Sequence, residues 1–139
     1  MTRYVYATNR VWSLDAFSRH RNTLPGEWAV VTSPYDLAAV VGAMAPRYIF
    51  FPHWSHIVPK AILDATECVC FHMTDVPYGR GGSPLQNLIV RGHEDTVLTA
   101  LRMTKVLDGG PVYGKIPLSL EGSAADIFAR MAEKAMGLI

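Results

Sequence analysis

Residues 68–84 read Cys-Val-Cys-Phe-His-Met-Thr-Asp-Val-Pro-Tyr-Gly-Arg-Gly-Gly-Ser-Pro, and this stretch decides how the rest of the chain is interpreted. Its beginning, Cys68–Met73, predicts a short buried strand because it is an apolar run rich in β-branched and aromatic side chains. Side chains alternate along a strand, so Cys68, Cys70 and His72 share one face and the residues between them share the other. His72 therefore lies near the carboxyl end of a strand, where open α/β sheets place their ligands.

The second half of the stretch, Tyr78–Pro84, contains three glycines and an arginine. This composition predicts a loop whose backbone can approach a ligand closely. Ser83 and Pro84 then predict the start of a helix, because serine is a good N-cap and proline is tolerated in the first turn.

The chain has 139 residues, of which 50% are hydrophobic and 18% are charged, and its formal net charge is +1. This composition predicts one globular domain over residues 1–139. The near-neutral charge argues against a nucleic-acid-binding surface, and no apolar stretch approaches the roughly 20 residues of a membrane span. Cys68 and Cys70 are too close along one strand to pair with each other. Free thiols and an N-terminus without a signal-peptide core predict a cytoplasmic protein.

Strand-like and helix-like patterns alternate along the chain. Such alternation predicts an α/β fold with a mostly parallel sheet and a late antiparallel portion. The first helix is expected to begin with Ser13 as its N-cap and the last with Ser123, and Ser33-Pro34 is expected to open the helix over residues 35–44. The expected strands cover residues 3–8, 28–32, 47–51, 68–73, 96–105 and 112–118, and the expected helices cover residues 13–20, 35–44, 59–64, 84–91 and the segment after 123.

His72 is the strongest candidate for chemistry, because imidazole titrates near neutral pH and this residue precedes a glycine loop. A buried, hydrogen-bonded strand histidine is the structural alternative. Asp108 follows a second strand, although Asp-Gly-Gly is also an ordinary turn sequence. If the strands that begin near Cys68 and Thr96 are neighbours, their carboxyl ends would bring His72 and Asp108 together, and the carboxylate would orient the ring.

Three other features are weaker candidates. The pair His53 and His56 suggests a metal, but no further cluster supplies the remaining ligands, so no metal is expected. Arg80 could hold a carboxylate or phosphate, or could pin its own loop; its glycine neighbours lack the spacing of a nucleotide-binding P-loop. Cys70 could be a thiol nucleophile, but a small buried hydrophobic residue is the favoured interpretation.

Residues 70–84 resemble the signature of the formyltransferases that depend on 10-formyltetrahydrofolate. A second element of that family matches Leu107-Asp-Gly-Gly110 and puts the family's catalytic aspartate on Asp108. A third element, an apolar strand followed by a helix start, matches residues 51–63. The amino-acid sequence of the first element is most similar to that of the branch that formylates nucleotide-linked amino sugars. The residues of this element in register with the family are His72, Pro77, Arg80, Gly81 and Pro84.

The resemblance implies a three-layer α/β formyltransferase fold, 10-formyltetrahydrofolate as the formyl donor, and no metal. It implies catalytic roles for His72, Asp108 and Cys70. The pteridine of the donor is expected between the segment after Phe51 and the turn at 104–108. The implied folate-binding residues are Pro52, His53, Trp54, Val58, Thr104, Lys105 and Val106, and the implied substrate-binding residues are Thr74, Arg80, Gly81 and Gly82.

Two departures from the family pattern leave alternatives open. Cys70 occupies the position of the family's catalytic asparagine, whose amide would help to stabilise an oxyanion, and the chain is short. The acceptor is expected to be a small-molecule amine, with no nucleic acid as partner and with a homodimer as one possible assembly. The alternatives are a hydrolase of formyltetrahydrofolate and a degenerate domain that binds folate or a protein without turnover.

Overall fold

The structure is a computed structural model that describes residues 1–73, 94–104 and 109–139. The helix expected over 84–91 lies outside the described residues. So do seven of the predicted site residues, namely Thr74, Arg80, Gly81, Gly82, Lys105, Val106 and Asp108.

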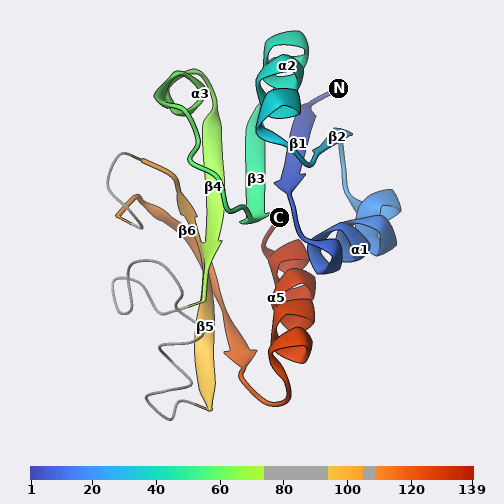
Figure 1. The fold of residues 1–139 in the computed structure, drawn as a ribbon, viewed down its shortest axis with the longest axis vertical. Coiled ribbons are helices and arrows are strands. Elements are labelled where there is room, and N and C mark those ends of the chain that lie inside the picture. Colours follow the sequence, from blue (N-terminus) through green and yellow to red (C-terminus); the bar gives the residue numbers. More distant parts are fainter. Residues whose placement is uncertain (74–93, 105–108) are drawn as a thin grey trace.

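The strands form one six-stranded sheet in the order β2-β1-β3-β4-β5-β6 (Figure 1). The first four strands in this order are parallel, while β4–β5 and β5–β6 are antiparallel pairs. The mostly parallel sheet with a late antiparallel portion is therefore confirmed. The bounds are β1 Arg3–Thr8, β2 Glu27–Val31, β3 Tyr48–His53, β4 Glu67–His72, β5 Asp95–Arg102 and β6 Val112–Ser119.

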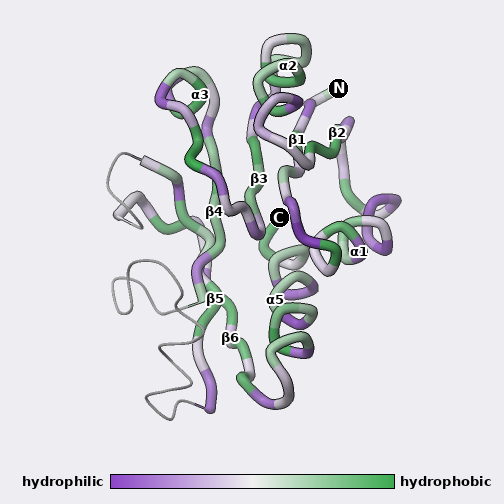
Figure 2. Tube along the Cα trace, viewed as in Figure 1, coloured by the Kyte–Doolittle hydropathy of each residue, from purple (hydrophilic) through white to green (hydrophobic). Residues whose placement is uncertain are grey.

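Helices cover both faces of the sheet, which gives the predicted three layers. Helices α1 (Val11–His20) and α5 (Ala124–Leu138) pack on one face, and α2 (Pro34–Met44) and α3 (Lys60–Ala65) pack on the other; a short 3₁₀ turn, Arg21–Thr23, follows α1. Hydrophobic and hydrophilic residues alternate along α5 (Figure 2), as expected for a helix with one buried face.

The alternation predicted for the central strand is confirmed. Val69, Phe71 and Met73 belong to the core on the α5 face, and Cys68 belongs to the separate core on the α2 and α3 face. Because alternate side chains share a face, Cys70 and His72 lie on the same side of the sheet as Cys68.

Two of the predicted helix starts are confirmed. The Ser33 hydroxyl accepts a hydrogen bond from the Asp36 N–H at 3.3 Å, and Ser123 forms a reciprocal capping box with Asp126. The prediction for Ser13 is wrong, because α1 begins at Val11 and Ser13 is fully buried inside the helix. The Ser13 carbonyl accepts a hydrogen bond from the Tyr6 hydroxyl at 3.0 Å, and this contact ties the first turn of α1 to β1.

The strands β4 and β5 are neighbours, as the sequence analysis supposed, but they are antiparallel. His72 is paired with Thr99, whereas Arg102, the last residue of β5, is paired with Val69. The strand ends at Arg102 and not at residue 105. The carboxyl ends of the two strands therefore do not meet, and the geometric argument for a contact between His72 and Asp108 was wrong.

Candidate functional site

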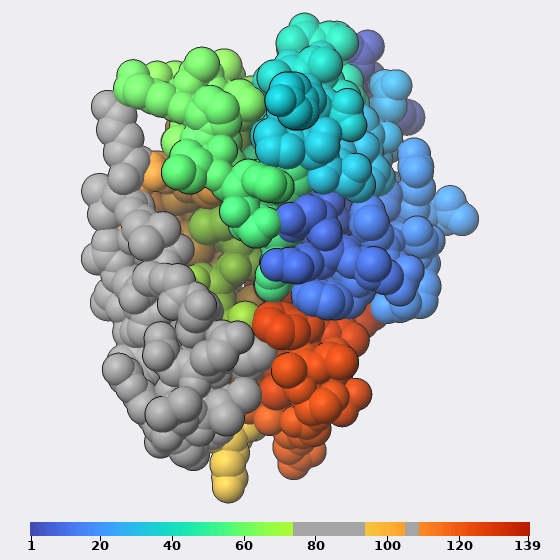
Figure 3. Space-filling view, viewed as in Figure 1, coloured from blue at the N-terminus to red at the C-terminus, as the bar shows by residue number. Residues whose placement is uncertain are grey.

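A cavity of about 220 Å³ lies at the carboxyl ends of β3 and β4. Figure 3 shows this side of the molecule hollowed between α3 and α5, with atoms of β4 at the bottom of the recess. The described residues that line the cavity are Phe51, Pro52, His53, Trp54, His56, Cys70, Phe71, His72, Met73, Met103 and Met131.

His72 and Cys70 supply the reactive side chains of this cavity. His72 is the last residue of β4 and is only 7% exposed, while Cys70 is half-buried and paired in register with Phe51 of β3. Both side chains extend from the same face of β4, so their Cα atoms lie about 6–7 Å apart. The arrangement holds an imidazole and a thiol within reach of one small molecule.

A β-bulge shapes the wall opposite β4. The register between β1 and β3 shifts after Tyr6, so that Thr8 pairs with His53. The Thr8 hydroxyl donates a hydrogen bond to the His53 carbonyl at 2.9 Å and accepts one from the Arg10 N–H at 3.2 Å. Bulges bend a strand and redirect its side chains, which is why they are common beside functional sites. Here the bulge directs residues 52–54 into the cavity wall.

His53 is held by aromatic rings and is kept neutral by its surroundings. Its ring meets Trp12 and Phe128 edge-on, with centroid distances of 5.6 and 5.4 Å. Burial lowers the pKa of His53 below 6.5, and the nearby positive charge of Arg10 lowers it further. An imidazole that stays neutral at pH 7 suits contact with an uncharged heterocycle better than with an anion.

Trp54 offers an unused hydrogen-bond donor at the same wall. Its ring lies edge-on to Phe51 at a centroid distance of 5.6 Å, and its indole Nε1 is buried with no hydrogen-bond partner among the described residues. A buried donor without a partner costs free energy, so a ligand acceptor at this point would recover it. Aromatic surface with a few polar groups is typical of a site for a flat heterocyclic ligand.

Only some of the predicted folate-binding residues that the structure describes line the cavity. Pro52, His53 and Trp54 line the cavity, whereas Val58 is 6% exposed and packs in the core of the α2 and α3 face. Thr104 lines a neighbouring hollow instead.

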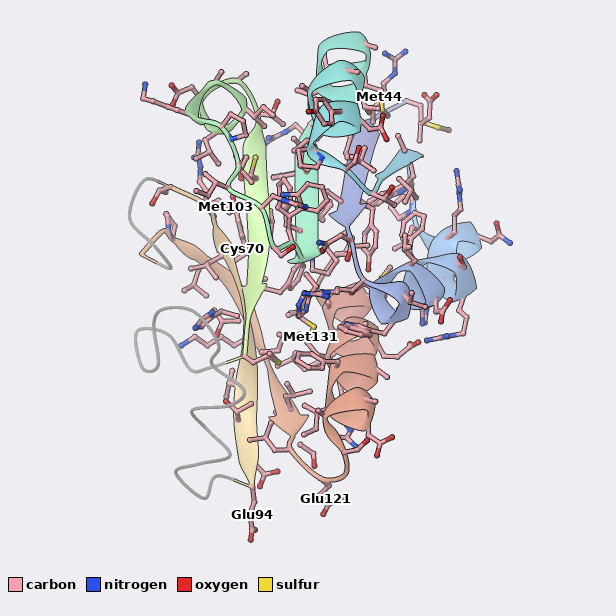
Figure 4. All side chains as sticks on the ribbon, viewed as in Figure 1. Met44, Cys70, Glu94, Met103, Glu121 and Met131 are labelled. Carbon is pink, nitrogen blue, oxygen red and sulfur yellow. The ribbon has the colours of Figure 1, made fainter. Side chains whose placement is uncertain are left out.

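Six cavity residues were not among the predicted site residues, namely Phe51, His56, Phe71, Met73, Met103 and Met131. Figure 4 shows Met103 on the α3 side of Cys70 and Met131 on α5. Both are apolar residues in segments that the sequence analysis assigned to a strand or a helix face, so no sequence signal separated them from the core.

Among the residues that the structure describes, no three His, Cys, Asp or Glu side chains gather as metal ligands would. None of the described helices has the length and apolar character needed to cross a membrane.

Two methionyl-tRNA formyltransferases are similar to this chain in sequence. The protein from Campylobacter curvus is 34% identical over 100 residues, which cover 71% of this chain and 33% of the relative. The structure of the protein from Clostridium thermocellum is 38% identical, has a TM-score of 0.90, and is matched over 96% of this chain and 60% of its own. This chain thus spans about a third of the length of its curated relatives. No protein-family model matches it.

Structures at lower identity share the fold. A candidate sugar N-formyltransferase from Mycobacterium tuberculosis is 22% identical with a TM-score of 0.69, over 99% of this chain and 66% of its own. HypX from Aquifex aeolicus, in complex with tetrahydrofolic acid, is 17% identical with a TM-score of 0.74, over 98% of this chain and 26% of its own. The predicted fold is therefore confirmed. The prediction against nucleic acid gains no support, because the relatives above 30% identity are named for a tRNA.

Proposed function

Because the chain belongs to the formyltransferase family by sequence and fold, we propose that it transfers a formyl group from 10-formyltetrahydrofolate to a primary amine. The observation that carries this proposal is the buried His72 at the carboxyl end of β4, facing a cavity that also contains Trp54 and Cys70. The resemblance of residues 70–84 had assigned the catalytic histidine to this same position.

The cavity suits the heterocyclic end of the donor. Phe51 and Met103 supply apolar contact, neutral His53 avoids placing a charge against the ring, and the Trp54 indole N–H is available to an acceptor on the ligand. A volume of about 220 Å³ is below the roughly 300–1,000 Å³ typical of sites that enclose a drug-sized ligand. The rest of the donor must therefore extend beyond this cavity.

In the proposed reaction the amine attacks the formyl carbon and a tetrahedral oxyanion forms. The oxyanion then collapses and expels the folate nitrogen, which takes up a proton as the amine gives one up. His72 either donates a hydrogen bond to the oxyanion in its protonated form or accepts the amine proton in its neutral form. We assign Asp108 to orienting His72 and to relaying charge. Thr74, Arg80, Gly81 and Gly82 are assigned to the acceptor side, and Lys105 and Val106 to the donor.

The side chain at position 70 affects the rate of formyl transfer that we expect. An amide in its place would donate a hydrogen bond to the oxyanion, and loss of one such donor raises the barrier by about 3 kcal/mol. We therefore expect Cys70→Asn to increase kcat about 100-fold if the site lacks another donor. An unchanged kcat in Cys70→Asn would mean that another donor already serves the oxyanion. Folate binding without turnover in either protein would favour the degenerate binding domain.

The acceptor has two candidates. The motif over residues 70–84 favours an amino sugar linked to a nucleotide. The names of the relatives favour the amino group of an aminoacyl-tRNA, and this second candidate rests on identities of 34% and 38%. A homodimer, a single domain over 1–139 and a cytoplasmic location stay predictions.

The decisive experiment measures tetrahydrofolate release and formylated product for wild type, His72→Ala and the control His20→Ala. His20 is a half-buried histidine at the end of α1 that pairs with Glu133 of α5 at 2.6 Å and does not line the cavity, so its loss should leave turnover intact. We expect His72→Ala to lose transfer by at least about 100-fold with its thermal transition preserved. Full turnover in His72→Ala would overturn the mechanism, and formate without formylated amine would identify a hydrolase.

A further inference from the structure

The strand that leads into the cavity wall is irregular at Pro52. β3 lies between β1 and β4, and proline has no N–H to donate to a neighbouring strand. Proline in an inner strand is therefore found mainly at bulges. Here the register between β1 and β3 shifts after Tyr6, so that Thr8 pairs with His53 and not with Pro52. The regular pairing thus ends where the wall of the cavity begins.

The segment that follows β3 has few ties to the rest of the protein. Residues 54–58 belong to no helix or strand, and within the described part of the chain no backbone–backbone hydrogen bond involves them. Ile57 in this segment is 94% exposed. Trp54 and His56 nevertheless line the cavity. The direction of their side chains therefore depends on contacts that side chains elsewhere in the protein make with this segment.

Two consecutive residues at the end of β1 supply hydrogen bonds to this segment. The Thr8 hydroxyl donates to the His53 carbonyl at 2.9 Å. That carbonyl belongs to the planar peptide that joins His53 to Trp54, so the bond fixes the direction in which the chain leaves β3. The side-chain amide of Asn9 donates to the Ser55 hydroxyl at 2.5 Å. These two bonds hold the segment on either side of Trp54.

The bond from Thr8 is the stronger of the two. Thr8 is fully buried, and its hydroxyl also accepts a hydrogen bond from the Arg10 N–H at 3.2 Å. Loss of this hydroxyl would leave two backbone groups without their partner. Ser55 is exposed, so water competes for its bond with Asn9. Thr8 therefore has the larger influence on where Trp54 lies.

On the basis of the proposed folate donor, we infer that Thr8 is a positioning residue for donor binding and that it acts through Trp54. The buried indole N–H of Trp54 has no partner among the described residues and is available to an acceptor on the heterocycle of the donor. Asn9 supports the same segment to a smaller extent. Neither Thr8 nor Asn9 is among the described residues that line the cavity, so both affect the ligand through the segment that they hold.

The test measures the affinity for a stable donor analogue, 10-formyl-5,8-dideazafolate, by calorimetric titration. We expect Thr8→Val to bind it about five- to tenfold more weakly, the factor by which one hydrogen bond changes a binding constant. Thr8→Ser keeps the hydroxyl and should bind like wild type. In the transfer assay, Thr8→Val should raise the KM for the donor and change kcat by less than about twofold, because the contact with the heterocycle is the same in the ground state and the transition state.

Further variants separate an effect through Trp54 from a general loss of stability. Trp54→Phe removes the indole N–H, so adding Thr8→Val to it should weaken binding little beyond Trp54→Phe alone. Asn9→Ala removes only the exposed bond and should weaken binding by about twofold. The control is Tyr6→Phe, which removes another buried hydroxyl of β1; that hydroxyl donates to the Ser13 carbonyl at 3.0 Å, and Tyr6 does not line the cavity. Tyr6→Phe should lower the midpoint of thermal unfolding and leave the affinity unchanged.

The outcomes separate this inference from the proposed function. The inference is wrong if Thr8→Val binds the analogue like wild type, if Tyr6→Phe weakens binding to the same extent, or if the losses from Thr8→Val and Trp54→Phe add in full. In each of these cases wild type still binds, and the folate site stands. Should Thr8→Val not fold, Asn9→Ala combined with Trp54→Phe makes the same comparison, and full additivity there would overturn the inference. If the analogue does not bind to wild type, the proposed function fails and the inference fails with it.

Discussion

Gly110 lies where the chain returns toward the sheet after β5, and it has no room for a side chain. A Cβ atom at this position would lie 1.9 Å from the carbonyl oxygen of Arg102 and 2.9 Å from its carbonyl carbon. Both are backbone atoms, so neither can rotate away. The Arg102 N–H also donates a hydrogen bond to the Pro111 carbonyl at 2.9 Å, which holds the two backbone segments at this spacing. Gly110→Ala must therefore move the backbone.

We expect this substitution to lower the free energy of unfolding by about 2–4 kcal/mol, from overpacking of about 1–3 kcal/mol and the weakening of one hydrogen bond of about 1 kcal/mol. The midpoint of thermal unfolding should fall by roughly 6–14 °C for a chain of this size. Urea titration and a thermal scan measure the two quantities.

The control is Gly114→Ala in β6, where a Cβ atom would meet only the end of the Leu138 side chain at 3.3 Å. This control should stay within about 0.5 kcal/mol of wild type. If Gly110→Ala were as stable as the control, the close approach of the backbone at Arg102 would not be required by the fold. The rate of formyl transfer in Gly110→Ala should fall by more than the loss of folded protein explains, because Asp108 is only two residues away in sequence.

Three further predictions concern stability. Gly42→Ala in α2, where a Cβ atom meets nothing within 4 Å, should raise the free energy of unfolding by about 0.5–1 kcal/mol in urea titration. Ser123→Ala removes the capping box of α5 and should cost about 1 kcal/mol by the same measurement; no loss would mean that water replaces the cap. Arg19 and then His20 lower the pKa of Glu133, so Glu133→Gln should be less stable than wild type at pH 7, by a screened amount of at most about 1 kcal/mol. Because the pKa of Glu133 is lowered from 4.5, its carboxylate stabilises the fold above pH 4.5, and the difference should shrink as pH falls below 4.5 and vanish once the lowered pKa is passed. A difference that does not decrease at all on acidification would refute the assignment.

Local patterns in the sequence were sufficient to predict most of the helices and strands that make up the three layers. The alternation in residues 68–73 gave the correct face for each side chain, because burial on both sides of a central strand leaves two separate apolar sets. Ser123 was predicted as a cap and Ser33 as the opening of a helix, and each hydroxyl accepts a hydrogen bond from an N–H in the first turn that follows it. Ser13 has the same residue type but is buried under β1, and no local signal separates these two environments.

The site was less predictable because its walls come from distant segments. Pro52, His53 and Trp54 were found through a motif, and their position depends on a bulge between β1 and β3 that the sequence pattern does not reveal. Met103 reaches the cavity from the position after β5 and Met131 from α5, and a methionine in either segment is indistinguishable from core until the elements are packed.

The direction of β5 has the largest consequence for the chemistry. A parallel β5 would have begun beside the amino end of β4. The segment with Arg80 would then have had to run from the carboxyl ends of the strands back to their amino ends. In the antiparallel pair, the residues that flank 74–93 both lie beyond His72, and the Thr96 hydroxyl donates a hydrogen bond to the Met73 carbonyl at 2.9 Å. The described residues on both sides of the glycine-rich motif therefore lie at the carboxyl end of β4, next to His72. Met103, which follows β5, instead lies beside Cys68, four residues before His72 on β4, because its N–H donates a hydrogen bond to the Cys68 carbonyl at 2.8 Å.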